Sequence, residues 1–215
     1  MERKLILRHS LIALAMGALA ASAQADFLDG SSVGLTVPHL TQDFSGSTLD
    51  ERDPVTNQFA RVTFTRAFYY QDLLGDLPNM SGGRLGNFIA NGDTQPGIFS
   101  AHFDQDLRAV AFSLNSQPGT GVFTAWLDGL MVATASASTH LDSLENYYGF
   151  TGLVFDEIRI DITSNQGNQI VDNVFALDNL QMVAAGVPTV PEPASVLLVL
   201  TGLALLGAVT RRRGA

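Results

Sequence analysis

The pattern of apolar and polar residues between positions 26 and 185 predicts short β-strands separated by turns. Glycine, asparagine, serine, threonine and aspartate interrupt runs that are rich in valine, phenylalanine, isoleucine and threonine. The segment 157–163 has the clearest period of two, with Ile158, Ile160 and Ile162 on one face, as expected for a half-buried strand. Helical periodicity is nearly absent, so we expect an antiparallel all-β domain.

Regular turn signals divide this region into about nine predicted strands. The nine clearer segments are 59–69, 85–90, 98–103, 107–114, 121–127, 130–137, 147–155, 157–163 and 174–183, and 33–37 is a candidate first strand. Asp128-Gly129 has the form of a two-residue hairpin turn, and Asn91-Gly92-Asp93 is a second strong turn signal. The segment 138–148 is predicted to be a loop with at most one helical turn. This number of strands suits a two-layer β-sandwich of jelly-roll type.

The first 25 residues have the three parts of a secretory signal peptide. Arg3, Lys4 and Arg8 are followed by the apolar stretch 11–20 and by the small residues of Ala23-Gln24-Ala25. This order predicts a signal helix that enters the Sec translocon and is cleaved by signal peptidase after Ala25.

The C-terminal segment predicts a helix that crosses the membrane. Residues 194–210 contain no charge, and Leu and Val dominate them. A helix of that length covers roughly 25 Å, at the short end of what spans a bilayer core. Arg211, Arg212 and Arg213 follow directly and are expected to stay in the cytoplasm, which leaves the bulk of the chain outside. The alternative is a buried terminal helix of a soluble domain, which would normally have a polar face.

The motif Pro191-Glu192-Pro193, the apolar run and the three arginines together resemble the PEP-CTERM sorting signal of Gram-negative bacteria. The resemblance implies recognition by an exosortase, an inner-membrane anchored precursor, processing near the motif, and a final place at the cell surface or in an exopolysaccharide matrix. We therefore divide the chain into a signal peptide (1–25), a β-sandwich domain (26–185), a linker (186–190) and a sorting tail (191–215).

The predicted domain is strongly acidic and contains no cysteine. Residues 26–191 hold six arginines, no lysine and nineteen acidic residues, so 6 − 19 gives a formal net charge of −13, against −9 for the whole chain. Such a charge repels nucleic acid and anionic membrane surfaces, so we expect no nucleic-acid partner. Without disulfides an exported domain depends on its hydrophobic core, and thiol catalysis is excluded.

Catalytic signatures are weak in this sequence. His39, His102 and His140 lie far apart and have no metal-ligand spacing, and no Gly-x-Ser-x-Gly elbow is present. A serine against His102 or His140 stays open, because triads assemble in space. Two carboxylate pairs are adjacent in sequence, Asp104 with Asp106 and Asp156 with Glu157, but acidic residues are also common at strand ends. We expect no enzymatic activity.

A calcium ion is the candidate ligand that the pattern favours most. Diffuse features of residues 40–183 are similar to the β-sandwich domains of PEP-CTERM proteins and to carbohydrate-binding jelly rolls, in which calcium often joins an early loop to the last strand. Asp43, Asp178 and Asn179 are the corresponding candidates. Asp178 lies on an otherwise apolar strand face and needs a partner, which is calcium, Arg61 or, alternatively, backbone hydrogen-bond donors.

Aromatic residues near loops are candidates for stacking on sugar rings. Tyr69, Tyr70 and Tyr147 flank predicted loops, whereas Trp126 is expected in the core. The sequence therefore favours an envelope or matrix protein with a structural or carbohydrate-binding role, and the alternative is a secreted enzyme that hydrolyses a polysaccharide or an ester.

Overall fold

The computed structural model describes residues 25–71, 76–87, 98–166, 169–172 and 174–186. The predicted signal peptide, the turn at 91–93 and the sorting tail lie outside these residues. Contacts divide the chain into two units, residues 1–185 and 186–215. Within the described residues, no helix has the length and apolar character needed to cross a membrane.

All regular structure in the described residues is β, as the sequence predicts. Twelve strands form one antiparallel sheet. They are β1 (Asp26–Ser31), β2 (Leu40–Gln42), β3 (Pro54–Val55), β4 (Val62–Thr65), β5 (Ala67–Tyr70), β6 (Arg84–Gly86), β7 (Phe99–Ser116), β8 (Gly119–Leu127), β9 (Leu130–Thr139), β10 (Tyr147–Gln166), β11 (Gln169–Asp172) and β12 (Phe175–Ala184). The main path through the sheet runs β3-β5-β6-β12-β7-β10-β8-β9.

Two long strands hold this sheet together. β7 and β10 pair with each other from Ser113 opposite Tyr147 to Phe99 opposite Ile160. Each has different outer neighbours along its two halves: β10 pairs first with β1 and then with β8, and β7 pairs first with β4 and then with β12. The register shifts where the neighbours change, and Gly152 has a φ of +76° there. Such irregularities let a strand pass from one layer to another.

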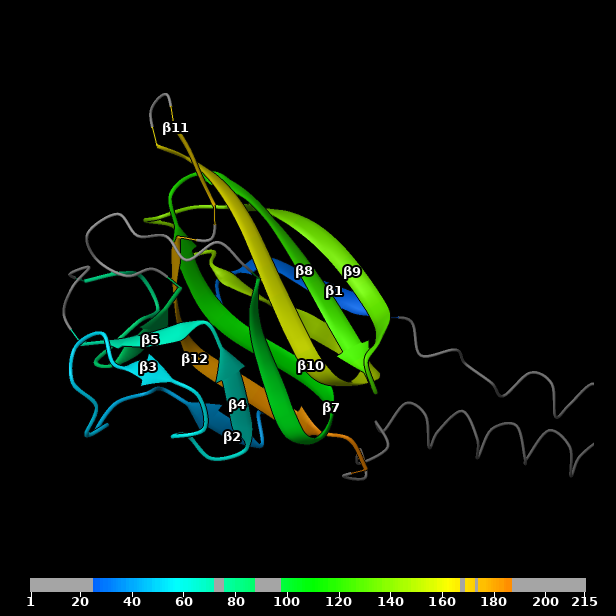
Figure 1. Cartoon of the computed structure of the whole chain (residues 1–215). Coiled ribbons are helices and arrows are strands. Elements are labelled where there is room, and N and C mark those ends of the chain that lie inside the picture. The colour runs from blue at the N-terminus through cyan, green and yellow to red at the C-terminus, as the bar shows by residue number, and fades with distance from the viewer. Residues whose placement is uncertain (1–24, 72–75, 88–97, 167–168, 173, 187–215) are drawn as a thin grey trace, which may run out of the picture. The chain divides into compact units, whose positions relative to one another are not determined.

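The two halves of the sheet face each other across one core. Phe123 of β8 pairs with Ile160, yet its ring contacts Phe27 of β1, Phe112 of β7 and Tyr148 of β10 at centroid distances of 5.3, 6.1 and 5.1 Å. Figure 1 shows β1 behind β8 and β9. The core is therefore closed by aromatic contacts between layers, although the pairings do not confirm jelly-roll connectivity.

Several predicted boundaries change. The segment 33–37 is not a strand, and the first strand is β1 instead. The segment 59–69 is divided between β4 and β5 by Arg66, which has a φ of +61°. The segments 98–103 and 107–114 are one strand, β7, and 147–155 and 157–163 are one strand, β10. The Asp128-Gly129 turn is confirmed, with φ values of +51° and +77°, and 138–148 contains no helix.

Truncation of Phe123 tests the cross-layer core. The side chain is 1% exposed, so Phe123→Ala should lower the free energy of unfolding by about 3–5 kcal/mol. Val122, its neighbour on the opposite face, is 42% exposed, and Val122→Ala should change it by less than about 0.5 kcal/mol. Denaturant unfolding of the full chain, followed by circular dichroism, measures both values. Equal effects of the two substitutions would contradict this placement of the core.

Candidate functional site

A buried carboxylate on the last strand is the most unusual polar group in the described residues. Asp178 is fully buried although its neighbours on β12 are mainly apolar. The pairing of β12 with β7 shifts in register between Asp178 and Gln181, and Asn179 has a φ of +50°. Asparagine tolerates this left-handed conformation better than most residues. The Asp178-Asn179 step therefore forms an irregularity that places polar groups inside an apolar strand.

Backbone N–H groups satisfy this carboxylate. The N–H of Ser81 donates to Oδ2 of Asp178 at 2.9 Å, and the N–H of Asn179 donates to Oδ1 at 2.6 Å. The Ser113 hydroxyl donates to the carbonyl oxygen of Asp178 at 3.0 Å. Asp178 thus connects β12 to the segment 76–83 and to β7.

A chain of asparagine side chains extends this connection. Asn179 Nδ2 donates to the carbonyl of Asn79 at 2.6 Å, and Asn79 Nδ2 donates to Asn146 Oδ1 at 2.6 Å and to the Leu144 carbonyl at 2.9 Å. Asn146 Nδ2 donates in turn to the carbonyl of Pro78 at 2.9 Å. Asp178, Asn179, Asn79 and Asn146, here named the Asp178 cluster, fasten the segments 76–83 and 140–146 to the last strand.

The early loop reaches the same region. Ser45 Oγ donates to the carbonyl of Ser81 at 3.3 Å. A Cβ atom on Gly83 would collide with the carbonyl oxygen of Phe44 and with the ring of Tyr69, so only glycine allows this close approach. The loop that contains Asp43 therefore packs against the segment that binds Asp178.

Burial dominates the electrostatics of the Asp178 cluster. The pKa of Asp178 is raised to about 7, and desolvation by burial is the largest cause. Hydrogen bonds from Ser81 and Asn179 and the charge of Arg84 lower this pKa, while the negative charge of Asp43 raises it. The pKa of Tyr147 is raised by burial and then by the charge of Asp178. Asp178 is thus a carboxyl group that changes its charge near neutral pH.

The structure brings the three candidate calcium ligands into one region, but they fit the ion poorly. Both oxygens of Asp178 already accept N–H groups, and Asp43 Oδ1 accepts the N–H of Ser45 at 3.1 Å. The described residues contain no group of three or more acidic or histidine side chains that could hold a metal. Arg61, the other candidate partner, lies 3.6 Å from Asp104. Of the three alternatives, the backbone donors are the contacts observed.

The three candidate sugar-contact tyrosines are inside the protein. Tyr69, Tyr70 and Tyr147 are 2%, 0% and 8% exposed. Their positions beside loops suggested exposure, but the loops fold over them, as the contact between Gly83 and Tyr69 shows. Ring faces at these positions are not available to an external sugar in this structure.

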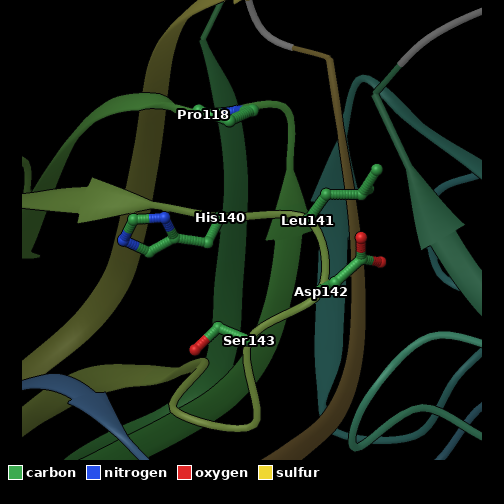
Figure 2. A pocket seen from close by; sticks show the side chains of 5 residues that line it. All are labelled: Pro118, His140, Leu141, Asp142 and Ser143. Carbon is green, nitrogen blue, oxygen red and sulfur yellow. The ribbon is translucent and has the colours of Figure 1, made fainter.

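The groups considered for hydrolysis are engaged elsewhere. His140, Leu141, Asp142 and Ser143 line an open pocket of ≈ 370 Å³ together with Pro118. Figure 2 shows the His140 ring and the Asp142 carboxylate pointing to opposite sides. The Ser143 hydroxyl accepts the N–H of Glu145 at 3.1 Å. This pocket therefore does not bring the three side chains together as a triad.

The carboxylate pairs also have other contacts. Asp104 faces Arg61, Asp156 Oδ2 accepts the N–H of Asp128 at 3.2 Å, and Glu157 binds Arg159. His102 is exposed on β7 and His39 is exposed just before β2. Neither acidic pair is arranged across a cleft in the described residues.

The expectation for Trp126 is wrong. Gly121, Phe123 and Ala125 are the buried positions of β8, so Trp126 has the opposite phase and points outward. The guanidinium carbon of Arg159 lies 3.8 Å from the centroid of the Trp126 ring. The alternation along residues 121–126 contains the signal that would have placed this side chain on the surface.

Comparison with known proteins identifies the end of the chain. Residues 189–213 match the family model of the PEP-CTERM protein-sorting motif. The chain carries a PEP-CTERM sorting signal. This confirms the resemblance of the tail, and the motif implies an exported, membrane-anchored precursor that is processed by an exosortase. No curated protein sequence and no solved structure matches the chain significantly.

Titration of Asp178 should appear in the stability of the protein. Its pKa in the folded state is about 7, above the ordinary value of 3.8, so its contribution to stability is full below pH ~4 and is lost as the pH rises through about 7. Urea unfolding of the full chain between pH 5 and 8 measures the free energy of unfolding of the wild type and of Asp178→Asn. The wild-type value minus the variant value should decrease as the pH rises. Asp142→Asn removes an exposed carboxylate and serves as the control. A constant difference between wild type and Asp178→Asn would contradict the assignment.

Calcium should have little effect on the same protein. Because N–H donors already satisfy Asp178, we expect the thermal midpoint to be the same in excess calcium and in chelator. A specific site would instead raise the stability by about 2.7 kcal/mol at a hundredfold excess over its dissociation constant. A calcium-dependent rise that is lost in both Asp43→Asn and Asp178→Asn would overturn this expectation and establish the metal site.

Proposed function

We propose that the chain is a non-catalytic protein of the cell surface or exopolysaccharide matrix, with a structural or carbohydrate-binding role. The PEP-CTERM sorting motif at residues 189–213 carries the proposal. It gives the chain a route out of the cell, and the all-β domain that precedes it is the part to be delivered. The remaining question is what such a domain does after delivery.

The construction of the domain suits a life outside the cell. It has no cysteine, so its stability does not depend on oxidation. Its continuous aromatic core and the Asp178 cluster stabilise it instead. Its negative charge favours solubility and disfavours anionic partners. These properties support a durable surface or matrix component whose carbohydrate ligands, if it binds them, are uncharged.

A secreted hydrolase would require convergent catalytic groups. In the described residues Asp104, Asp156 and Glu157 face basic or backbone groups, and the pocket at His140 directs its ring and the Asp142 carboxylate apart. The geometry therefore supports the non-catalytic role better than the enzymatic alternative.

Substitution in the sorting motif tests the proposed route. Pro191 and Pro193 lie inside the matched segment, whereas Pro188 lies one residue before it. In a Gram-negative host with an exosortase, the double variant Pro191→Ala/Pro193→Ala should accumulate in the membrane fraction. Its intact mass should be that of the protein with the C-terminal tail still attached. The wild type and Pro188→Ala should reach the cell surface or medium with a shortened C-terminus, as measured by fractionation and intact mass.

The same fractionation without the exosortase is the second arm of this experiment. All three proteins should then remain in the membrane fraction. If the wild type is processed normally in that host, or if the double variant is processed like Pro188→Ala, the proposed route is wrong.

A further inference from the structure

The outward face of β4, β7, β10, β8 and β9 carries mainly polar side chains around the chain's only tryptophan. Residues paired directly across antiparallel strands point to the same side of a sheet. The pairings therefore define two adjacent rows on this face, named here the Trp126 face. One row is Thr63, His102, Glu157, Trp126 and Met131, and the other is Thr65, Ser100, Arg159, Thr124 and Thr134.

Contacts between neighbouring side chains hold the centre of the Trp126 face in place. Arg159 Nε and Nη2 bind the two oxygens of Glu157 at 2.8 and 3.1 Å. The guanidinium lies 3.8 Å from the Trp126 ring centroid, and the indole Nε1 donates to the Thr124 hydroxyl at 2.8 Å. A planar ring is thus fixed beside a planar, bidentate ion pair, so little freedom is left to lose when a ligand binds.

The location of this group needs an explanation beyond packing. The inward positions of β8 are Gly121, Phe123 and Ala125, so the largest side chain of the strand is left at the surface while a small alanine fills the core beside it. The guanidinium lies over the indole ring, and Trp126 stays partly accessible to solvent. A partly exposed aromatic ring with polar neighbours is typical of a binding surface.

We propose that the Trp126 face binds an uncharged polysaccharide chain, an inference that rests on the proposed matrix role. The apolar C–H face of a sugar ring would lie on the indole, while Arg159, Glu157 and the surrounding threonine hydroxyls would exchange hydrogen bonds with sugar hydroxyls. Five strands at spacings of about 4.8 Å make the rows roughly 19 Å long, enough for an extended chain lying across the strands.

Charge selects among carbohydrate ligands. Glu157 neutralises Arg159, the only basic group of the two rows apart from His102. The net charge of −13 between residues 26 and 191 would repel a uronic-acid or sulfated polymer. The surface therefore fits a neutral chain rather than an anionic one.

Intrinsic fluorescence provides a direct readout, because Trp126 is the only tryptophan in the sequence. The full chain, in a detergent without a sugar headgroup, is titrated with cellohexaose, xylohexaose and mannohexaose, and with polygalacturonate as the anionic control. We expect a saturable change in tryptophan emission with at least one neutral hexasaccharide and none with polygalacturonate.

Variants assign the binding to this face. By calorimetry, Trp126→Phe and Arg159→Lys should each weaken binding by roughly tenfold, the first because a smaller ring offers less stacking area and the second because lysine lacks the planar fork. Leu144→Ala, at a side chain that is 67% exposed on the segment 140–146, should bind like the wild type. Unchanged circular dichroism excludes unfolding as the cause of a loss.

Three results would overturn the proposal. They are no emission change with any neutral hexasaccharide, binding that survives both substitutions, and an emission change that depends on protein concentration alone, which would mean that a second copy covers the face. None of them affects the sorting experiment with Pro191 and Pro193, so a matrix protein that binds no sugar is distinguished from a chain that is not exported through the motif.

Discussion

The pairing of β7 with β10 is the constraint on which the rest of the structure depends. Among the described strands, β1, β4, β8, β11 and β12 pair directly with β7 or β10. The other five, β2, β3, β5, β6 and β9, are attached through β12 or β8. Because each long strand changes its outer neighbour half-way along, the same pair of strands builds both layers. Rings such as Phe123 and Phe27 then meet across the core without any disulfide to hold the layers.

Polar contacts attach the loops to the sheet. Loops carry backbone groups that no ladder satisfies, and in this protein the Asp178 cluster supplies partners for those of the segments 76–83 and 140–146. A buried, hydrogen-bonded carboxylate adds less net stability than an apolar group of equal size, but it specifies one arrangement. The charged pair of the Trp126 face, Glu157 and Arg159, is by contrast only partly buried.

The sequence predicted the all-β class of the structure better than its strand boundaries and connectivity. Alternation located the inward isoleucines of β10 and the Asp128-Gly129 turn, because both are set by neighbours in the chain. It divided β7 and β10 at the point where their register shifts, since a polar interruption such as Asp104 to Asp106 reads as a loop although the strand continues through it. The importance of Asp178 was visible as a charge on an apolar face, whereas its donor, the N–H of Ser81, lies ninety-seven residues away and leaves no trace in the local pattern. The sorting motif needs no tertiary information, and the family model confirms it over residues 189–213.

The connectivity of the central strands also has a kinetic consequence. β7 can pair with β4 early, but β1 and the central ladder of β7 must wait for β10, and β2 must wait for β12 at the far end of the domain. Contacts this distant in sequence slow folding, because a large loop must close before any contact rewards it. A chain that crosses a membrane from its N-terminus would thus emerge with β1 and β2 unpaired, and its two layers would close only when nearly the whole domain has passed. Such late folding would keep the chain unfolded enough to pass through a membrane channel while export continues.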